Sequence, residues 1–268
     1  MEIEVFRDTV YSHYETAGRK FPWRGKASPW GIMVSEFMLQ QTQVERVIPF
    51  WKNWMNKWPD IKDVAKASME DVLREWNGLG YNRRGYFLKR SAEMIVRHYD
   101  GRVPGVPQNL LPLPGIGPYI AGAIACFAYN YPSVFIETNI RSALIHDFFP
   151  DRYDVKDSEI RPILEQALDR KNPRKWYYAL MDYGAALKKQ TENPGRRSAH
   201  YVKQSPFEGS LRQARGKILK TLVSTGPSNL EEIGMLTKID TDELYRVLII
   251  LKKESMVSES EGIYRIVY

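Results

Sequence analysis

A glycine-containing turn at residues 113–118, with the sequence LPGIGP, precedes an apolar stretch of the kind that forms a buried helix. Gly115 and Gly117 allow the backbone to turn tightly, and they expose amide N–H groups at the positive end of the following helix dipole. Such an arrangement can bind a phosphate group without reading any base. Taken alone, the turn is equally compatible with an ordinary helix entry.

A lone acidic residue, Glu36, lies in the stretch VSEFMLQQT, which carries no other charge. Its neighbours Met33, Phe37 and Met38 are apolar, so full exposure of the Glu36 side chain is not expected. The alternative interpretation is a charge on the solvent face of a helix. These residues alone leave both interpretations open.

A second lone acid, Glu137, lies in the stretch VFIETN and precedes a predicted helix at 139–149. Thr138 or Asn139 is the natural N-cap of that helix. A carboxylate close to a helix N-terminus is stabilised in its ionised form. The alternative interpretation is an acid that only supports the cap.

Helical periodicity dominates the chain as far as about residue 190. Ser28 and Pro29 form an N-cap and first-turn pair ahead of the apolar stretch at 30–42. Apolar residues at three- and four-residue spacing predict further helices at 69–79, 83–99, 118–129, 139–149, 158–170 and 173–189. Gly, Pro, Asn and Asp occupy the joints, as they do in turns. The predicted fold class is therefore all-α.

The character of the sequence changes after residue 188. The segment 188–220 holds nine Lys or Arg residues and two Glu residues, which indicates either a solvated linker or contact with nucleic acid. Three short helices are then predicted, followed by a β-hairpin around a Ser-Glu-Gly turn at 256–268. This order is winged-helix-like (α+β), a pattern that serves DNA binding in some proteins and protein docking in others. The predicted domains are a core at 1–207, with lobes at 25–127 and at 1–24 plus 128–207, and a module at 208–268.

Composition and charge restrict the class of protein. The 268 residues are 43% hydrophobic and 26% charged, as in globular proteins, and the net charge of +7 favours an anionic partner. An acidic N-terminus and the lack of a long apolar run predict an intracellular protein without a membrane segment, cytoplasmic or, in a eukaryote, nuclear. The single cysteine, Cys126, lies in an apolar run, so disulfides and multi-cysteine metal sites are excluded.

Four motifs in the same order resemble the helix-hairpin-helix glycosylase superfamily, and in particular its MutY-like adenine glycosylase branch. The motifs are FPWRGKASPWGIMVSEFMLQQTQVERVIPF, WNGLGYNRRGYFLKRSAEMIV, LPGIGPYIAGAI and YALMDYGAAL. The resemblance covers about residues 5–190. It implies a two-lobed helical glycosylase core whose glycine turn holds a DNA phosphate. Such enzymes flip a nucleotide out of the duplex and cleave its N-glycosidic bond through an oxocarbenium-like transition state.

The resemblance implies three catalytic positions. Glu36 matches the general acid of the adenine glycosylases, and Glu137 stands where the family has the Asp that stabilises the sugar cation. Glutamate is one methylene longer, and a misplacement of about 1 Å can cost about a hundredfold in rate. Tyr119 stands where bifunctional members carry a nucleophilic lysine, which implies an enzyme without AP-lyase activity.

The resemblance also implies residues that contact DNA. Gln41 would fill the gap left by the flipped base, and Asn82 stands where the adenine branch has an aromatic wedge. Tyr81, the residue before Asn82, is an aromatic residue that could stack on a base in place of that wedge. The full predicted set is Gln40, Gln41, Thr42, Tyr81, Asn82, Arg83, Gly115, Gly117, Lys188, Lys189, Arg196 and Arg197.

The chain departs from its branch in two ways. The four cysteines that usually hold an iron–sulfur cluster fall near Lys188, Gly195, Ser198 and Gln204, so no cysteine-ligated cluster can form. The 8-oxoguanine-recognition domain is replaced by the winged-helix-like module. We expect no required cofactor or metal, with a monovalent cation on the hairpin carbonyls as the one ion considered.

These observations predict a monomeric, monofunctional DNA glycosylase of base excision repair that acts on a mismatched or damaged base in duplex DNA. The leading substrate is adenine opposite guanine or 8-oxoguanine, because the SEFMLQQTQV stretch is close to that branch. Thymine or uracil opposite guanine is the alternative substrate, since Tyr119 and Asn82 are typical of mismatch glycosylases of that type. The alternative class is a non-catalytic DNA-binding protein on a glycosylase scaffold.

Overall fold

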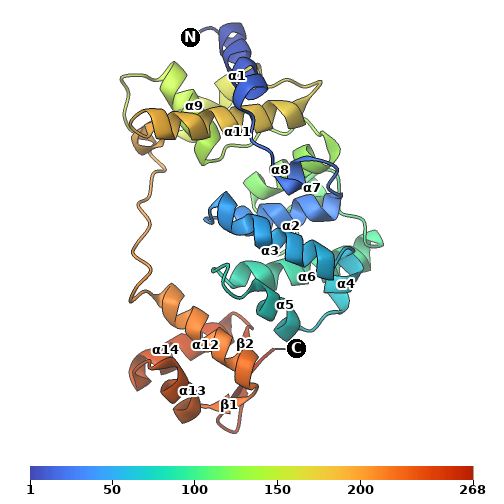
Figure 1. The fold of residues 1–268 in the computed structure, drawn as a ribbon, viewed down its shortest axis with the longest axis vertical. Helices are drawn as coiled ribbons and strands as arrows, with labels where there is room; N and C mark the ends of the chain where they lie inside the picture. Colours follow the sequence, from blue (N-terminus) through green and yellow to red (C-terminus); the bar gives the residue numbers. More distant parts are fainter. Residues whose placement is uncertain (268) are drawn as a thin grey trace. The chain divides into compact units, whose positions relative to one another are not determined.

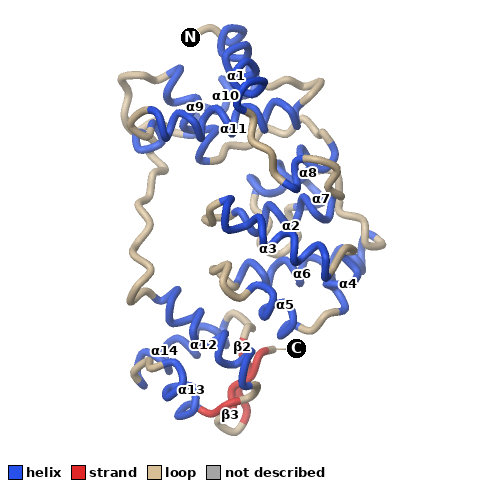
Figure 2. The backbone as a smooth tube through the Cα atoms, viewed as in Figure 1, coloured by secondary structure: helices blue, strands red, loops and turns tan. Residues whose placement is uncertain are grey.

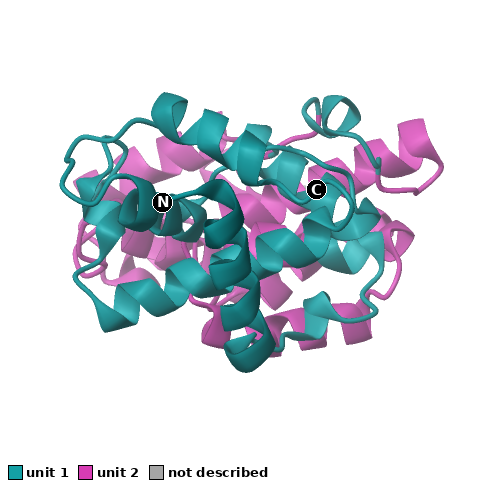
Figure 3. Ribbon diagram, turned by 90° about the horizontal axis from the view of Figure 1, so that it is seen from above, with its two compact units in different colours: residues 1–33, 104–112, 116–203 teal, residues 34–103, 113–115, 204–268 magenta. Residues whose placement is uncertain are grey.

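A computed structural model describes residues 1–267 of the chain and shows a helical protein with one small sheet (Figures 1 and 2). The chain forms two compact units, each assembled from segments that are distant in sequence (Figure 3). Unit 1 comprises residues 1–33, 104–112 and 116–203, and unit 2 comprises residues 34–103, 113–115 and the chain from 204 onward. Residues 25–33, 104–112 and 116–127 thus group with unit 1, whereas the predicted lobe at 25–127 includes them, and the predicted module at 208 onward groups with unit 2. Within residues 1–267, no helix has both the length and the apolar composition needed to cross a membrane.

Unit 1 is organised around two long helices, because α11 packs along α9 and α1 packs on α11. The ring of Phe135 stacks on that of Tyr177 with the centroids 4.0 Å apart, and α8 is buried over most of its length. The apolar helix predicted after the glycine turn is therefore confirmed. The helices are α1 (Ile3–Ala17), η1 (Pro22–Arg24), α7 (Pro107–Leu110), α8 (Pro118–Tyr129), α9 (Thr138–Phe148), α10 (Asp157–Ala167), α11 (Pro173–Gln190) and η2 (Pro194–Arg197).

A buried carboxylate joins the N-terminal segment of unit 1 to α11. Asp182 is 2% exposed and forms two hydrogen bonds with Arg24, of 2.7 and 2.9 Å, and two more with the backbone and side chain of Arg19. Burial alone would raise the pKa of Asp182, but the hydrogen bonds and charges of Arg24 and Arg19 outweigh it and hold the pKa below its usual range. The motif YALMDYGAAL thus contributes an ion-pair network to the fold.

Unit 2 begins within α2 and is completed by helices that pack on α6. Helix α6 contacts both α4 and α5, and Gly85 makes the second contact possible, since a Cβ at this position would lie 2.8 Å from the Trp76 ring. The predicted start of α2 is confirmed, because the Ser28 Oγ accepts a hydrogen bond of 3.1 Å from the Gly31 amide. The helices are α2 (Pro29–Leu39), α3 (Val44–Lys57), α4 (Ile61–Lys66), α5 (Met69–Trp76) and α6 (Arg83–Tyr99).

The C-terminal module has three helices and a three-stranded antiparallel sheet in the order β1-β3-β2. Glu261 and Gly262 both have positive φ, 54° and 77°, which is the geometry of a two-residue type I′ hairpin turn. The winged-helix-like pattern is therefore confirmed, except that Tyr268 at the end of the predicted hairpin lies outside the described residues. The elements are α12 (Leu211–Thr225), β1 (Ser228–Asn229), α13 (Leu230–Thr237), α14 (Thr241–Lys253), β2 (Val257–Ser260) and β3 (Ile263–Ile266).

Candidate active site

Glu36 lies on α2 in a stretch of helix that is buried on every side. Glu36 is only 4% exposed, and residues 31–38 are all buried. The expected shielding of Glu36 is confirmed, and the alternative of a solvent-facing helix charge is wrong. Glu36 is thus a shielded acid on a buried segment of α2.

Glu137 is itself the N-cap of α9, which corrects the expectation that Thr138 or Asn139 would cap the helix. Its Oε1 accepts hydrogen bonds from the amides of Asn139 and Ile140, at 2.6 and 2.8 Å. Its Oε2 accepts from the Thr138 hydroxyl and from the Asn139 side-chain amide, both at 3.1 Å. These four hydrogen bonds fix the Glu137 carboxyl group at the start of α9.

Lys188, on α11, is linked to this carboxylate through Asn139. The Lys188 Nζ donates a hydrogen bond of 2.9 Å to the Asn139 Oδ1, so Lys188, Asn139 and Glu137 form a continuous polar chain. Burial lowers the pKa of Lys188, and the nearby charge of Glu137 partly opposes that shift. The sequence predicted a DNA contact for Lys188, whereas the structure gives it an internal partner.

The glycine turn leads from unit 2 into α8. Gly115 has φ of 77°, and a Cβ there would lie 2.7 Å from the Phe87 Cβ, so only glycine fits this position without displacement. Within unit 2, the Ser91 hydroxyl donates a hydrogen bond of 2.8 Å to the Pro114 carbonyl and anchors the turn to α6. Gly117 is the N-cap of α8 and brings no capping side chain, which leaves the helix N-terminus open to an anion.

Tyr119 follows on the first turn of α8 in unit 1. Its ring packs edge-on against Phe135, with the centroids 5.9 Å apart, and the residue is half-buried. This contact packs the start of α8 against the Phe135 ring.

Gln40, Gln41 and Thr42 form the connection after α2, as predicted. Gln41 is exposed and has φ of 54°, a left-handed conformation that non-glycine residues rarely adopt. Among the described residues, no hydrogen-bond partner faces the buried Nε2 of Gln40. A strained, exposed glutamine at a loop tip fits the predicted role of entering a gap in the duplex.

A buried arginine, Arg84, fixes this loop to the loop that precedes α6. Its Nη1 donates to the carbonyls of Met38, at 2.7 Å, and Gln40. Its Nη2 donates to the Thr42 hydroxyl and to the Gly80 carbonyl, each at 3.0 Å. Burial lowers the pKa of Arg84 to about 10, so the guanidinium remains charged at neutral pH. Sequence reasoning missed this residue and selected its neighbour, since nothing in the pattern RRG says which arginine turns inward.

The loop before α6 carries Tyr81, Asn82 and Arg83. Tyr81 has φ of 49° and is half-buried, and Asn82 is the N-cap of α6 without a side-chain capping bond. Arg83 is exposed, and its Nη1 lies 3.7 Å from a carboxylate oxygen of Glu254 in the C-terminal module. Tyr81, Asn82 and Arg83, which the sequence predicts to contact DNA, are thus adjacent at the start of α6.

Comparison with known proteins places these residues in one family. Residues 34–170 match the family model described as "HhH-GPD superfamily base excision DNA repair protein", a range that includes Glu36, Tyr119 and Glu137. The chain belongs to the HhH-GPD superfamily. It is 32% identical to an adenine DNA glycosylase of Mycobacterium tuberculosis over 92% of this chain and 88% of that protein. It is 34% identical to the human adenine DNA glycosylase over 69% of this chain and 36% of that protein.

Solved structures agree on the fold. A thermostable thymine-DNA glycosylase superposes with a TM-score of 0.61 at 24% identity, over 68% of this chain and 86% of that chain. An endonuclease III in a non-covalent complex with DNA superposes with the same TM-score at 16% identity, over 71% of this chain and 90% of that chain. The predicted fold class, a helix-hairpin-helix glycosylase core, is confirmed.

The alignment with the mycobacterial relative also bears on the C-terminal module. Only 8% of this chain lies outside that alignment, whereas residues 208–268 make up more than a fifth of the chain. Most of the module must therefore lie inside the aligned region. This HhH-GPD chain thus shares its C-terminal part with the mycobacterial protein.

The segment that follows α11 holds no set of ligands for an iron–sulfur cluster. The chain has one cysteine, Cys126, and it is buried in α8. Arg197 donates a hydrogen bond of 2.6 Å to the Phe149 carbonyl, and a backbone bridge joins Ser198 to Val155. Gly195 packs so closely that a Cβ would lie 2.8 Å from the Ser142 Oγ. Protein contacts therefore hold this segment of the HhH-GPD fold against α9.

The predicted basic contacts of this segment differ in their surroundings. Lys189 and Arg196 are exposed, whereas Arg197 is committed to the carbonyls at the end of α9. Arg196 forms an exposed ion pair of 3.9 Å with Glu192, whereas Lys188 and Arg197 have partners inside the fold.

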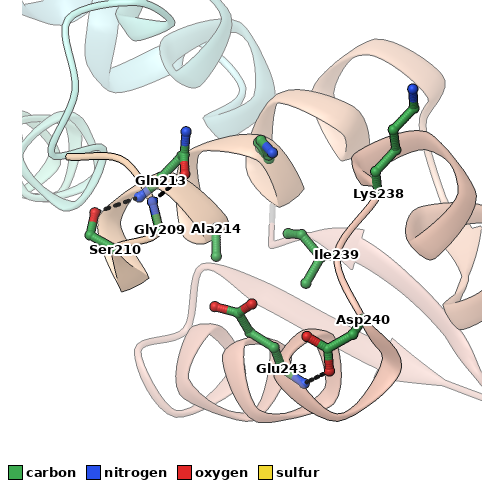
Figure 4. A pocket seen from close by; sticks show the side chains of 9 residues that line it. Gly209, Ser210, Gln213, Ala214, Lys238, Ile239, Asp240 and Glu243 are labelled. Carbon is green, nitrogen blue, oxygen red and sulfur yellow. Dashed lines mark hydrogen bonds between the residues drawn. The ribbon is translucent and has the colours of Figure 1, made fainter.

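One shallow pocket of about 300 Å³ lies in the C-terminal module, between the start of α12 and the start of α14 (Figure 4). Its polar groups serve the helix ends. Asp240 accepts a hydrogen bond of 3.0 Å from the Glu243 amide as the N-cap of α14, and Gln213 accepts one of 2.9 Å from the Gly209 amide. None of the predicted site residues lines this pocket.

Proposed function

We propose that this protein is a monofunctional adenine DNA glycosylase that removes adenine opposite guanine or 8-oxoguanine in duplex DNA. The observation that carries the proposal is the buried Glu36 on α2, at the position where the adenine glycosylases have their general acid. The identity of 32% with an adenine DNA glycosylase over 92% of the chain supports the same substrate.

Glu36 donates its proton to N7 of the flipped adenine, which makes the base a better leaving group. The bond between C1′ and N9 then breaks, and both of its electrons leave with the base. The sugar becomes an oxocarbenium ion that the ionised Glu137 stabilises. Water adds to C1′ and gives up a proton, which restores the carboxylic acid of Glu36, and the products are an abasic site and free adenine.

The extra methylene of Glu137 relative to the family's Asp is accommodated by the capping geometry. Both carboxylate oxygens accept hydrogen bonds from the first turn of α9, so the longer side chain curls back to the helix start. We infer that these capping bonds offset the extra methylene of Glu137.

The glycine turn and the probing loop supply DNA binding. Gly115 and the open N-terminus of α8 behind Gly117 bind a backbone phosphate, and the hairpin carbonyls are the site for a monovalent cation. Gln41 fills the space left by the flipped nucleotide. The protein acts as a monomer, without an iron–sulfur cluster or other required cofactor.

Absence of AP-lyase activity rests on Tyr119, since a tyrosine cannot form the Schiff base that leads to strand cleavage. Borohydride treatment during the reaction tests this point, because it traps any enzyme–DNA Schiff base covalently. No trapped complex is expected. A trapped complex would show that another amine, such as that of Lys188, takes the nucleophile's role.

A second candidate activity is excision of thymine or uracil opposite guanine. It rests on Asn82 and Tyr119, the two positions at which the chain resembles the mismatch glycosylases instead of the adenine branch.

The deciding experiment is single-turnover incubation with duplexes that carry adenine, thymine, uracil or hypoxanthine opposite guanine or 8-oxoguanine, followed by alkali. Alkali-labile sites on the adenine duplexes alone support the proposal. Cleavage of the thymine and uracil duplexes alone supports the second candidate, and tight DNA binding with no labile sites would indicate a non-catalytic protein.

A further inference from the structure

The C-terminal module and the residues just before it bind Tyr81, which lies in the loop at 78–83 that precedes α6. Arg212, on the first turn of α12, donates a hydrogen bond to the Tyr81 hydroxyl, and Gln204 donates a second. The Arg212 Cζ lies 5.4 Å from the centroid of the Tyr81 ring. Both donors belong to the chain from 204 onward, and neither lies in the region that matches the family model.

Two further contacts extend this interface within unit 2. Glu254, the C-cap of α14, pairs with Arg83, which lies two residues after Tyr81, and also receives a hydrogen bond of 3.0 Å from Arg215. Helix α12 packs against α5, which ends just before the loop. The module therefore contacts both sides of the segment 78–83.

The loop needs such support because its backbone is strained. Tyr81 has φ of 49°, and a bulky residue in this conformation persists only where its surroundings hold it. Arg84 holds one side, since its Cζ lies 5.3 Å from the centroid of the same ring. Arg212 holds the hydroxyl end. Two guanidinium groups, one from the core and one from the module, thus define where the Tyr81 ring lies.

We propose that Arg212 is a positioning residue through which the C-terminal module presents Tyr81 to the DNA strand opposite the flipped base. An aromatic ring held in place at that strand contributes stacking energy, and a ring that moves freely loses much of it to conformational entropy. The module then contributes to the discrimination between a mismatched and a normal base pair. This inference rests on the proposed function for the identity of the ligand.

The test is a double-mutant cycle with Arg212→Ala, Tyr81→Phe and the two combined, in the full-length protein. Tyr81→Phe keeps the ring and removes only the hydroxyl that Arg212 binds. The measured quantity is the ratio of affinities for a mismatched and a matched duplex, with a 2′-fluorinated deoxyadenosine that resists excision. Arg246→Ala is the matched control, because Arg246 is an exposed arginine on α14 of the same module.

Each single variant is expected to lower the ratio by about fivefold to tenfold, and the double variant to lower it by less than the product of the two effects, since both changes break the Arg212–Tyr81 hydrogen bond. Melting temperatures and the ratio for Arg246→Ala should stay near those of the wild type. Additive effects of the two changes, or an Arg212→Ala ratio equal to that of Arg246→Ala, would overturn the inference.

Failure of the proposed function gives a different result. A wild-type protein that prefers mismatched duplexes but leaves no labile sites would refute the glycosylase activity, and the cycle would still report on Arg212 and Tyr81. A wild-type protein without any mismatch preference would overturn the role assigned to the module.

Discussion

The Arg84 Nη1 donates a hydrogen bond of 2.7 Å to the backbone carbonyl of Met38, close to the end of the helix that carries Glu36. The same guanidinium also binds the Gly80 carbonyl, before Tyr81. One buried side chain therefore fixes the distance between the two loops that the sequence predicts to probe DNA. The loops and the helix of the proposed general acid are thus parts of one rigid arrangement.

Replacement of Arg84 by methionine leaves these carbonyls without a donor in a buried site. We expect the free energy of unfolding to fall by about 2–4 kcal/mol. The neighbouring Arg83→Met is the matched control, because Arg83 is exposed and its loss should cost below about 1 kcal/mol. Urea unfolding of both variants measures the difference, and equal stabilities would show that Arg84 does not hold the loops.

Replacement of Glu137 by serine separates helix capping from chemistry. Serine is a good N-cap, so α9 should lose below about 1 kcal/mol. It carries no negative charge, so the single-turnover rate of adenine excision should fall by at least about a hundredfold. A serine variant with nearly wild-type activity would mean that Glu137 is only a cap.

Replacement of Lys188 by methionine removes the cation that holds Asn139 beside Glu137. We expect about a tenfold lower excision rate with little change in melting temperature, since a misplaced carboxylate loses part of its stabilising effect. Lys189→Met is the matched control, because Lys189 is exposed on the next position of α11. In Lys189→Met, the affinity for DNA should fall, whereas the excision rate at saturating enzyme should stay at the wild-type value. If the two variants behave alike, Lys188 is an ordinary phosphate contact.

Acid should weaken unit 1 through Asp182. Its pKa in the folded protein lies below the usual value of 3.8, so its ion pairs stabilise the fold at neutral pH, and this contribution is lost as the pH falls through the folded-state pKa. Asp182→Asn should lower stability at pH 7 by about 3–5 kcal/mol and flatten the loss of stability below pH 4. Thermal melts from pH 3 to pH 7 measure both effects, and parallel curves for the two proteins would contradict this assignment.

Much of the fold could be predicted because the spacing of apolar residues indicates the helices, and Pro, Gly or Ser marks their ends. The predicted helices at 83–99 and 118–129 coincide with α6 and α8, and the pair Ser28 and Pro29 does begin α2. The apolar neighbours Met33, Phe37 and Met38 argued against full exposure of Glu36, and the structure decided between that interpretation and a solvent-facing charge.

Other features could not be predicted, because they depend on which side chain meets which backbone group. No pattern distinguishes Arg84, which turns inward, from Arg83, which stays outside. Glu137 replaced Thr138 and Asn139 as the N-cap because its longer side chain reaches two amides of the first turn. The contacts of Lys188 and Arg212 join positions 49 and 131 residues apart in sequence, and spacing along the chain carries no signal for them.

The most direct test of the central claim is the single-turnover excision rate of Glu36→Gln on a duplex with adenine opposite 8-oxoguanine. Glutamine fills the same buried space but cannot donate a proton in the way a carboxylic acid does. The proposal predicts a rate about 10²–10⁴-fold below that of the wild type, with unchanged DNA affinity. Excision of adenine by Glu36→Gln at a rate close to that of the wild type would contradict it.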